Sequence, residues 1–368
     1  MDIIHIVLGK ANPERMNGVN KVVHQLAFRQ ASSGKNIQVW GITEDLTHNY
    51  GERNFKTRLF KKCKNPFAIS SKLKNAIAQS KNTTFHLHGG WIPTFWAVAK
   101  CLKKHNKNSV LTPHGAYNTI AMKTNGWRKK IYFQLFEKSV LKTMSKIHCI
   151  GASEKEGLEA IYPNRKQIVI PYGFDQSPLD SFIKTHNNTF VVGFIGRIDI
   201  HTKGLDLLTQ AFSKFRKDKD TKLWIVGDSN EMPILKRMLE DVGISKETIL
   251  YGSKFGMEKN DLIKQMDVFA HPSRNEGLPT AVLEAASFGI PSIVTKATNV
   301  GDYITQYDAG KCIQNENVEE LVMALEEFYL EWQAHTISKY TASTSTMLNK
   351  EFNWEGLVEK YDKLYLKV

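Results

Sequence analysis

Short apolar runs alternate with amphipathic stretches along most of the chain. In the first half, the runs long enough for a buried strand cover residues 3–9, 36–43, 83–89, 109–115, 146–153 and 167–175. The stretches between them place apolar residues at helical spacing and cover residues 18–34, 70–81, 93–106, 127–145 and 153–163. Strands that are separated by helices predict a parallel sheet with helices on both faces.

A polar, turn-rich segment over residues 173–189 interrupts this alternation and is predicted to be a linker. Strands then resume, and they are expected at residues 190–198, 222–228, 248–253, 268–273 and 291–296. We therefore predict an α/β protein with a first domain over residues 1–172, a second domain over 190–345 and a terminal helix over 346–368. Two such domains are expected to face a cleft, where ligands meet the carboxyl ends of the strands.

The chain is long enough for two hydrophobic cores, since 42% of its 368 residues are hydrophobic. No apolar run approaches the roughly 20 residues that a membrane-spanning helix needs. The first residues, MDIIHIVLGK, have an acidic flank and no basic segment, so we interpret them as a buried strand and not as a signal peptide. The four cysteines form no CxxC pair and no metal-binding spacing, which favours reduced thiols in the cytoplasm.

Positive charge is concentrated in the first half of the chain. Residues 1–172 contain 28 basic and 9 acidic residues, so they carry +19, whereas the whole chain carries only +13. No acidic residue occurs between Arg53 and Phe136, and the cations there are interleaved with aromatic residues. Such a surface indicates an anionic partner, and the aromatic residues favour an anionic membrane surface over nucleic acid. A solvated basic surface without a partner is the alternative.

Two carboxylates flank the start of a predicted helix in HPSRNEGLPTAVLEAASFGIP, residues 271–291. Gly277 marks a turn, and the helix is expected to begin near Thr280. The start of a helix binds anions through its N–H groups and its dipole. Glu276 in the loop and Glu284 inside the helix can each accept hydrogen bonds from sugar hydroxyls. The arrangement favours a ligand with a central diphosphate and hydroxyls at both ends, and two surface glutamates without a ligand are the alternative.

A second candidate for diphosphate binding is the segment GFIGRIDIHTKGLDLL, residues 193–208. Gly196 closes a strand, Arg197 follows it, and Lys203 precedes a helix. Arginine binds phosphate through two parallel hydrogen bonds, and lysine binds it as a compact charge. Two cations after one strand can therefore neutralise a diphosphate leaving group, although either of them alone fits a surface cation equally well.

The first domain offers two further features of a ligand site. Asn17 and Gly18 form a tight turn into a helix, where the backbone can approach a ligand closely. His114 follows a strand, so it is either a ligand-binding residue in the cleft or a core residue with satisfied hydrogen bonds.

The sequence predicts no metal site. His86 and His88 alternate on one strand and share a face, but no third ligand is evident. The string Asp218-Lys219-Asp220 lies in a charged turn, and we interpret it as a solvated loop and not as a metal-nucleotide site.

These segments resemble the retaining GT-B glycosyltransferases, the group often called group 1 or family 4. EGLPTAVLE resembles the E-x7-E motif of that group, and GFIGRIDIHTKGLDLL resembles its Gly-Arg…Lys-Gly segment. VFAHPSRNEGLP, EAASFGIPSIVT, IPYGFD and NGVNKVVHQLA extend the resemblance over nearly the whole chain, with Asn17 in place of the commoner glycine. The resemblance implies two Rossmann-like domains that face a cleft and a C-terminal helix that crosses back to the first domain.

The resemblance also implies roles for individual residues. Glu276 would hold the hydroxyls of the donor sugar, and Glu284 would hold the ribose of the nucleotide. Arg197 and Lys203 would stabilise the departing diphosphate. Backbone groups would assist them at Gly277, Leu278 and Thr280, and Gly18 would approach the phosphates. His114 would lie near the donor sugar and the acceptor.

The implied reaction is the metal-independent transfer of a hexose, with retention, from a UDP- or GDP-type nucleotide-sugar, and no cofactor is implied. The expected acceptor is a lipid-linked oligosaccharide of bacterial surface polysaccharide synthesis, such as O-antigen, capsule or exopolysaccharide. The enzyme is expected at the cytoplasmic face of the cell membrane as a peripheral protein. A nucleotide-sugar epimerase or a soluble sugar transferase with the same fold is the alternative. A nucleic-acid-binding protein is a third possibility, but it leaves Glu276 and Glu284 unexplained.

Overall fold

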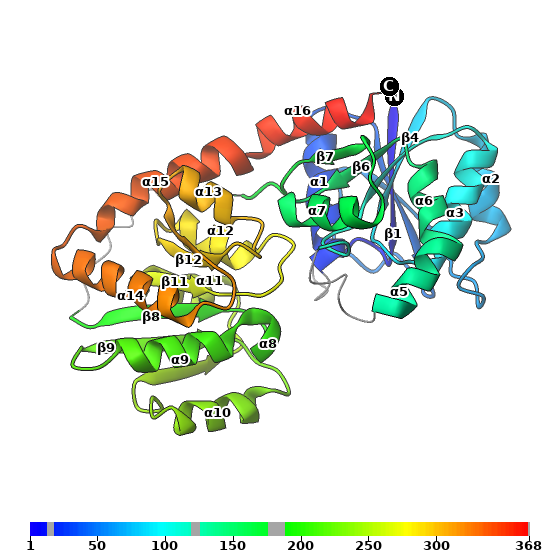
Figure 1. Cartoon of the computed structure of the whole chain (residues 1–368). Helices are drawn as coiled ribbons and strands as arrows, with labels where there is room; N and C mark the ends of the chain where they lie inside the picture. Colours follow the sequence, from blue (N-terminus) through cyan, green and yellow to red (C-terminus); the bar gives the residue numbers. More distant parts are fainter. Residues whose placement is uncertain (13–17, 119–125, 176–187, 367–368) are drawn as a thin grey trace. The chain divides into compact units, whose positions relative to one another are not determined.

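The computed structural model describes residues 1–12, 18–118, 126–175 and 188–366. The chain forms two compact units, one of Met1–Gly173 with Trp354–Val368 and the other of Phe174–Asn353 (Figure 1). Each unit is built around its own parallel sheet, which confirms the fold class predicted from the alternation of apolar and amphipathic segments.

The first unit contains a seven-stranded parallel sheet in the order β3-β2-β1-β4-β5-β6-β7. Its strands are β1 (Asp2–Leu8), β2 (Ile37–Thr43), β3 (Lys56–Lys61), β4 (Thr83–His88), β5 (Asn108–Thr112), β6 (Lys146–Cys149) and β7 (Gln167–Val169). Its helices are α1 (Gly18–Ser32), α2 (Ser71–Gln79), α3 (Pro93–Lys104), α5 (Gly126–Tyr132), α6 (Lys138–Thr143), α7 (Ala152–Ile161) and α16 (Trp354–Tyr365). The edge strand β3 was not predicted, because only Phe60 of its six residues is buried and the apolar signal is therefore weak.

The helix predicted over residues 127–145 contains a π-helical turn, Phe133–Glu137, between α5 and α6. Phe133 and Glu137 are buried at this turn. The Glu137 carboxylate accepts a hydrogen bond from the Trp91 backbone N–H at 2.9 Å and another from the Tyr117 hydroxyl. A π turn adds a residue to the helical repeat, so it rotates the following side chains relative to an uninterrupted α-helix.

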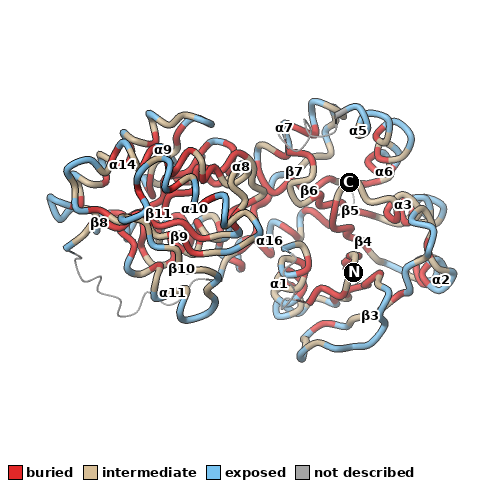
Figure 2. The backbone as a smooth tube through the Cα atoms, turned by 90° about the horizontal axis from the view of Figure 1, so that it is seen from below, coloured by how far each residue is buried: buried red, intermediate tan, exposed pale blue. Residues whose placement is uncertain are grey.

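The second unit contains a six-stranded parallel sheet in the order β10-β9-β8-β11-β12-β13. Its strands are β8 (Phe190–Ile195), β9 (Thr221–Val226), β10 (Thr248–Gly252), β11 (Val268–His271), β12 (Ser292–Thr295) and β13 (Gly310–Ile313). Its α-helices are α8 (Ile200–Lys203), α9 (Leu205–Phe215), α10 (Met232–Asp241), α11 (Gly256–Gln265), α12 (Thr280–Ser287), α13 (Gly301–Gln306), α14 (Val318–Gln333) and α15 (Tyr340–Met347). Every residue of β8 is buried, as expected for a central strand covered on both faces (Figure 2).

The terminal helix predicted over residues 346–368 is divided between the two units, and the part that belongs to the first unit, α16, begins at Trp354. Residues up to Asn353 belong to the second unit, where the buried ring of Phe352 lies 5.1 Å from that of Tyr303. Helix α16 belongs to the first unit, which agrees with the expected return of the chain. Its Trp354 ring fills the space beside Gly173, where an added Cβ would lie 2.2 Å from a ring atom. The chain therefore leaves and re-enters the first unit at neighbouring positions.

Both sheets change the direction of strand addition at their centre, between β1 and β4 in the first unit and between β8 and β11 in the second. The carboxyl ends of the strands at such a switch point are the usual ligand-binding position in open parallel sheets. None of the helices in the described parts of the chain is long and apolar enough to cross a bilayer.

Candidate active site

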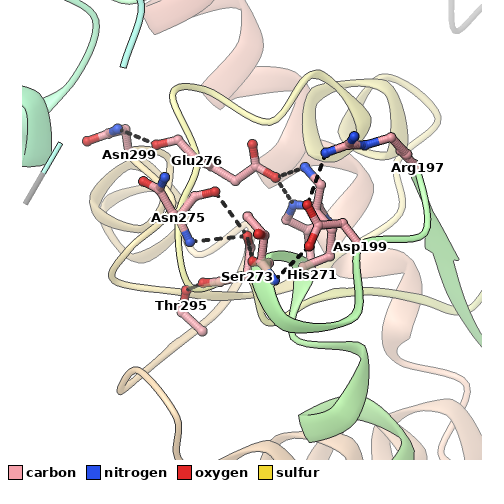
Figure 3. Close-up of polar contacts among 10 residues, drawn as sticks. Arg197, Asp199, His271, Ser273, Asn275, Glu276, Thr295 and Asn299 are labelled. Carbon is pink, nitrogen blue, oxygen red and sulfur yellow. Dashed lines mark hydrogen bonds and ion pairs between the residues drawn. The ribbon is translucent and has the colours of Figure 1, made fainter. Parts of the chain in front are cut away.

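The loop that follows β11 carries Glu276, and β11 lies beside the switch point of the second sheet. Figure 3 shows the polar contacts around Glu276. The Asn299 side-chain amide donates to the backbone carbonyls of Glu276 at 2.9 Å and Gly277 at 2.6 Å. The Glu276 backbone N–H donates to the Ala297 carbonyl at 3.4 Å. These bonds hold the loop against the segment after β12, so Glu276 has a fixed backbone position.

The Glu276 carboxylate is an ionised acceptor in a cationic environment. It accepts hydrogen bonds from Nζ of Lys203 and, at 2.9 Å, from Nε2 of His271. Only 14% of the Glu276 side chain is exposed. Burial raises the pKa of this carboxyl, but the His271 hydrogen bond and the Lys203 charge outweigh burial and lower the pKa to about 2. Glu276 is therefore charged at neutral pH and can accept hydrogen bonds from hydroxyl groups.

Lys203 reaches this carboxylate because of the tight junction between α8 and α9. Gly204 adopts φ +67°, and a Cβ at this position would lie 2.1 Å from the Pro272 carbonyl oxygen. Only glycine permits this close approach between the junction and the loop after β11. The Lys-Gly pair of the sequence motif thus places a cation beside a carboxylate 73 residues away.

Arg197 lies on the same strand-to-helix segment but has a different partner. It follows β8 and Gly196, and its Nη2 donates to the Asp199 carboxylate at 3.0 Å. Asp199 in turn caps α8 by accepting from the Thr202 backbone N–H at 3.1 Å. The Arg197 side chain is 69% exposed, so its guanidinium is accessible to an anionic ligand.

The start of α12 follows the Glu276 loop directly, and Pro279 is the cap residue before Thr280. Leu278 is buried, whereas Thr280 is exposed. Glu284 lies within α12 and forms an ion pair at 2.9 Å with Lys259 of α11. The two glutamates of the motif therefore have separate cationic partners in the structure.

Arg274 is a residue of this loop that the sequence analysis did not single out. Its guanidinium forms two parallel hydrogen bonds of 2.8 Å with the Asp206 carboxylate, and Nη1 also donates to the His201 carbonyl at 2.7 Å. The side chain is 8% exposed. Arg274 thus ties the Glu276 loop to the first turn of α9. The motif string contains this arginine, but its partner is 68 residues away and no local pattern identifies it.

Replacing Arg274 with alanine is expected to destabilise the second unit by about 3–5 kcal/mol, since one partner of a largely buried ion pair is lost. Arg274→Lys should recover only part of this loss, because lysine cannot form both parallel bonds. Denaturant unfolding measured by circular dichroism tests the expectation. Arg197→Ala is the control, since an exposed pair contributes about 0–1 kcal/mol. Equal stability losses in Arg274→Ala and Arg197→Ala would contradict this role.

The remaining predicted residues belong to the first unit. His114 has φ +58°, and its ring bonds to Nδ1 of His88 at 2.9 Å and to the Tyr172 hydroxyl. The following residue, Gly115, donates its backbone N–H to the buried Glu154 carboxylate at 2.6 Å. Gly18 is the first residue of α1, and an added Cβ there would meet no atom within 4 Å. Asn17 lies outside the described residues.

The structure places a third histidine beside the pair His86 and His88. His5 of β1 lies opposite His86 of β4 in the parallel register. One ring nitrogen from each of the three residues lies within 4.8 Å of the others. The sequence could not indicate this group, because β1 and β4 are far apart along the chain.

Known families match most of the chain. The model described as Glycosyltransferase Family 4 matches residues 16–177, and the model described as Glycosyl transferases group 1 matches residues 177–344.

Two curated relatives are similar at low identity. A GDP-mannose:cellobiosyl-diphosphopolyprenol alpha-mannosyltransferase from Xanthomonas campestris is 22% identical, covering 98% of this chain and 95% of that protein. A UDP-Gal:alpha-D-GlcNAc-diphosphoundecaprenol alpha-1,3-galactosyltransferase from Escherichia coli is 25% identical, covering 64% of this chain and 62% of that protein.

A solved structure has the same fold. The Anabaena protein HepE in complex with UDP-glucose superimposes with a TM-score of 0.70 at 14% identity, covering 99% of this chain and 98% of that one. Three observations agree. The chain has two parallel sheets, and a Lys203–Glu276 pair lies at the switch point of one of them. Two family models together match residues 16–344. The chain belongs to the group 1 glycosyltransferases of the GT-B fold.

Proposed function

We propose that this protein is a retaining, metal-independent hexosyltransferase that uses a nucleotide-sugar of the UDP or GDP type. The acceptor is a lipid-linked oligosaccharide of bacterial surface polysaccharide synthesis. The observation that carries the proposal is the Lys203–Glu276–His271 cluster at the carboxyl ends of β8 and β11, next to the start of α12.

Each part of this cluster suits one part of the donor. The ionised Glu276 carboxylate accepts hydrogen bonds from the hydroxyls of the transferred sugar, which orients its anomeric carbon. Lys203, Arg197 and the N–H groups at the start of α12 stabilise the charge that develops on the departing diphosphate. A preorganised donor of this kind contributes on the order of 3 kcal/mol to transition-state stabilisation. Because Glu276 is already paired with Lys203 and His271, it acts as an orienting group and not as a nucleophile.

The other predicted residues complete the proposed donor site. Glu284 binds the ribose, and this requires its carboxylate to exchange or share the Lys259 ion pair. Gly196, Gly277, Leu278 and Thr280 contribute backbone groups around the diphosphate. For the first unit, the sequence resemblance implies that Gly18 and Asn17 approach the donor phosphates and that His114 contacts the transferred sugar, and Asn17 lies outside the described residues.

The lipid-linked acceptor is supported by the relatives. The Xanthomonas protein is named for a cellobiosyl-diphosphopolyprenol acceptor, and the Escherichia coli protein for a GlcNAc-diphosphoundecaprenol acceptor. Both acceptors carry a diphosphate and a long isoprenoid chain, so an enzyme that uses such an acceptor must work at a membrane surface.

Nucleotide release tests the proposed function. Purified protein is incubated with a panel of UDP-, GDP-, ADP- and dTDP-sugars, with and without a bacterial membrane lipid extract. Release of one nucleotide that rises with lipid is expected, together with a glycolipid product of retained anomeric configuration. Conversion of the sugar without nucleotide release would instead identify an epimerase. No release from any donor, together with salt-sensitive binding to nucleic acid, would overturn the proposal.

The first unit has an exposed surface that suits an anionic membrane. Trp127, Ile131 and Leu135 are spaced four residues apart along α5 and the π-helical turn, and their exposed fractions are 66%, 53% and 62%. Arg128 and Lys130 are exposed between them. Apolar and aromatic side chains among cations are typical of segments that insert at the headgroup level of acidic lipid. We propose that this stripe, Trp127–Ile131–Leu135, holds the enzyme at the cytoplasmic face of the membrane.

Serine substitutions at all three positions of the stripe are expected to weaken binding to phosphatidylglycerol vesicles by at least about tenfold, because full burial of one large apolar side chain contributes about 1.5–3 kcal/mol and the variant loses three. Vesicle co-sedimentation at low and high salt measures the effect. The matched control replaces Phe255 and Met257, which are exposed apolar residues of the second unit, with serine. Unchanged binding of the triple variant would show that the stripe is not the membrane contact.

A further inference from the structure

A continuous chain of hydrogen bonds passes through the core of the first unit and contains five histidines: His5, His86, His88, His114 and His148. Four of them are almost fully buried, with exposed fractions of 0–2%, and His114 is half-buried. They come from β1, β4, β6 and the segment after β5, which meet around the switch point of the sheet. Each ring nitrogen of these five residues has a hydrogen-bond partner.

The hydrogen bond at one end of this chain determines which group donates and which accepts in all the others. Nε2 of His148 lies 2.7 Å from the Ile170 carbonyl oxygen, which can only accept, so Nε2 carries the proton. Burial lowers the pKa of His148 to about 4, so the ring is neutral and Nδ1 accepts from the Thr112 hydroxyl at 2.7 Å. The single hydroxyl hydrogen of Thr112 is then used, and its oxygen accepts from Nε2 of His86 at 2.6 Å.

The next hydrogen bonds involve residues of α16 and α1. Nδ1 of His86 accepts from the Tyr365 hydroxyl of α16 at 2.9 Å. The Tyr365 oxygen therefore accepts from Nε2 of Gln30 at 3.1 Å. This bond orients the Gln30 amide, so that its Oε1 accepts from Nε2 of His5 at 2.8 Å.

The last bonds lead to His114. Nδ1 of His5 accepts from Nε2 of His88 at 2.9 Å, and Nδ1 of His88 accepts from Nε2 of His114 at 2.9 Å. Nδ1 of His114 then accepts from the Tyr172 hydroxyl. The nine bonds thus run in one direction from Tyr172 to Ile170, and every ring carries its proton on Nε2.

A metal ion is the competing interpretation, because ring nitrogens of His5, His86 and His88 lie close together. An ion bound by one nitrogen of each ring would displace a hydrogen bond at every nitrogen it takes, because all six ring nitrogens of these residues have partners. It would leave a buried donor or acceptor unpaired, which costs about 1–3 kcal/mol for each group. The donor and acceptor pattern is complete without an ion, and it has one consistent assignment throughout.

We propose that this chain of hydrogen bonds positions the proton of His114 on Nε2. The chain of bonds depends on the docking of α16, because Tyr365 of that helix is one of its members. Nδ1 of His114 is then a hydrogen-bond acceptor. In the structure it accepts from the Tyr172 hydroxyl, which a ligand hydroxyl would replace. Thr112, Gln30 and Tyr365 are positioning residues, since they act on His114 only through other groups. The consequence for catalysis rests on the proposed function, in which His114 contacts the transferred sugar.

Histidine tautomers measured by long-range ¹H–¹⁵N NMR at neutral pH, without any donor, provide the first test. The wild-type protein is expected to show all five rings neutral with the proton on Nε2. A proton on Nδ1 of His114, or a charged ring in the chain, would overturn the proposed direction. Stoichiometric binding of Zn²⁺ that changes the signals of His5, His86 and His88 would overturn it in favour of a metal site.

Two substitutions each remove one hydroxyl from the chain of hydrogen bonds, at different elements of the fold. Thr112→Val and Tyr365→Phe each separate His114 from the Ile170 carbonyl, so the remaining bonds can run in either direction. The Nε2–H form of His114 is expected to fall and an Nδ1–H form to appear, since both neutral tautomers are available to an unconstrained imidazole. Thr112→Ser should restore a single tautomer. Tyr361→Phe is the control on α16, because the buried Tyr361 hydroxyl has no hydrogen-bond partner among the described residues.

A single Nε2–H tautomer of His114 in either folded variant, Thr112→Val or Tyr365→Phe, would refute the coupling. If one variant folds poorly, the other decides. In the transfer assay, KM for the donor should rise in these two variants by the inverse of the Nε2–H fraction measured by NMR while kcat stays unchanged, because the other molecules lack the acceptor. The tautomer measurement needs no substrate. Correct tautomers without transfer from any donor would therefore reject the proposed function and leave the proposed role of this chain of hydrogen bonds intact.

Discussion

The first unit is expected to unfold between pH 7 and pH 5 while the second unit stays folded. Burial lowers the pKa of His5 and His148 to about 4 and that of His114 to about 3, and it holds the pKa of His86 and His88 well below 6.5. In the unfolded chain these rings bind protons below about pH 6.5. The unfolded state therefore takes up more protons than the folded state, and stability falls as the pH falls.

The magnitude follows from five such groups. Relative to pH 7, each histidine favours the unfolded state by about 1.8 kcal/mol at pH 5, so the five together contribute about 9 kcal/mol. Glu154 acts in the opposite direction, because burial raises its pKa to about 7, and it offsets about 2 kcal/mol of this loss. Burial also raises the pKa of Glu137 and adds to that offset. The remaining loss of about 7 kcal/mol is comparable to the whole stability of many domains.

Hydrogen exchange resolved by peptide, recorded from pH 7 to pH 5, measures the two units separately. Peptides of β1, β4 and β6 should lose protection together, whereas peptides of β8 and β11 serve as the internal control, since the five histidines all lie in the first unit. Full protection of β4 at pH 5 would mean that these histidines take up protons within the folded state. Loss of protection in both units at the same pH would point to a cause other than the histidine chain.

Glu276→Gln is expected to lower the transfer rate by at least about a hundredfold, the effect of removing one preorganised polar group from a transition state. Glutamine has the same shape and keeps one oxygen that can accept from Lys203 and His271, but it is neutral and carries an NH2 donor in place of the second carboxylate oxygen. The sugar hydroxyls would lose an ionised acceptor, and Lys203 would lose its anionic partner. Nucleotide release at saturating donor and lipid measures the change.

The same substitution should leave the second unit folded but less stable. The pKa of Glu276 is lowered from 4.5 to about 2, so the folded state favours the carboxylate by about 3 kcal/mol above pH 4.5, and this contribution is lost as the pH falls toward 2. Glu258→Gln is the control, because its carboxylate is 73% exposed in a surface pair with Lys254. A Glu276→Gln enzyme with wild-type turnover would reject the site assignment, whereas an unfolded one would require Lys203→Met as a second test of the pair.

Local patterns in the sequence were sufficient for the architecture. Alternating apolar and amphipathic segments predict parallel sheets, because a strand buried on both faces is almost wholly apolar and a surface helix repeats every 3.6 residues. The linker predicted over residues 173–189 falls between the last strand of the first sheet and the first strand of the second along the sequence, and its residues 176–187 lie outside the described residues. The motifs also identified Lys203 and Glu276, which the structure brings into contact. Strand β3 was missed because an edge strand buries few side chains.

Only the tertiary structure decided which charged and polar groups are partners. The sequence placed Arg197 and Lys203 in one role, but Arg197 pairs with Asp199 and Lys203 with Glu276, while Glu284 pairs with Lys259. These pairings depend on how successive strands and helices return to one edge of a sheet, and no periodicity in the chain records that return.

The histidine chain shows the same division most clearly. A strand pattern indicates that His86 and His88 share a face, but it does not indicate that β1 pairs with β4 and places His5 opposite them. Tyr365 of α16 belongs to this chain of hydrogen bonds, and its hydroxyl contacts Gln30, which is 335 residues away in the sequence. Local sequence determines which face of an element is apolar, whereas the direction of a buried hydrogen-bond chain follows from long-range packing that brings one backbone carbonyl to one imidazole.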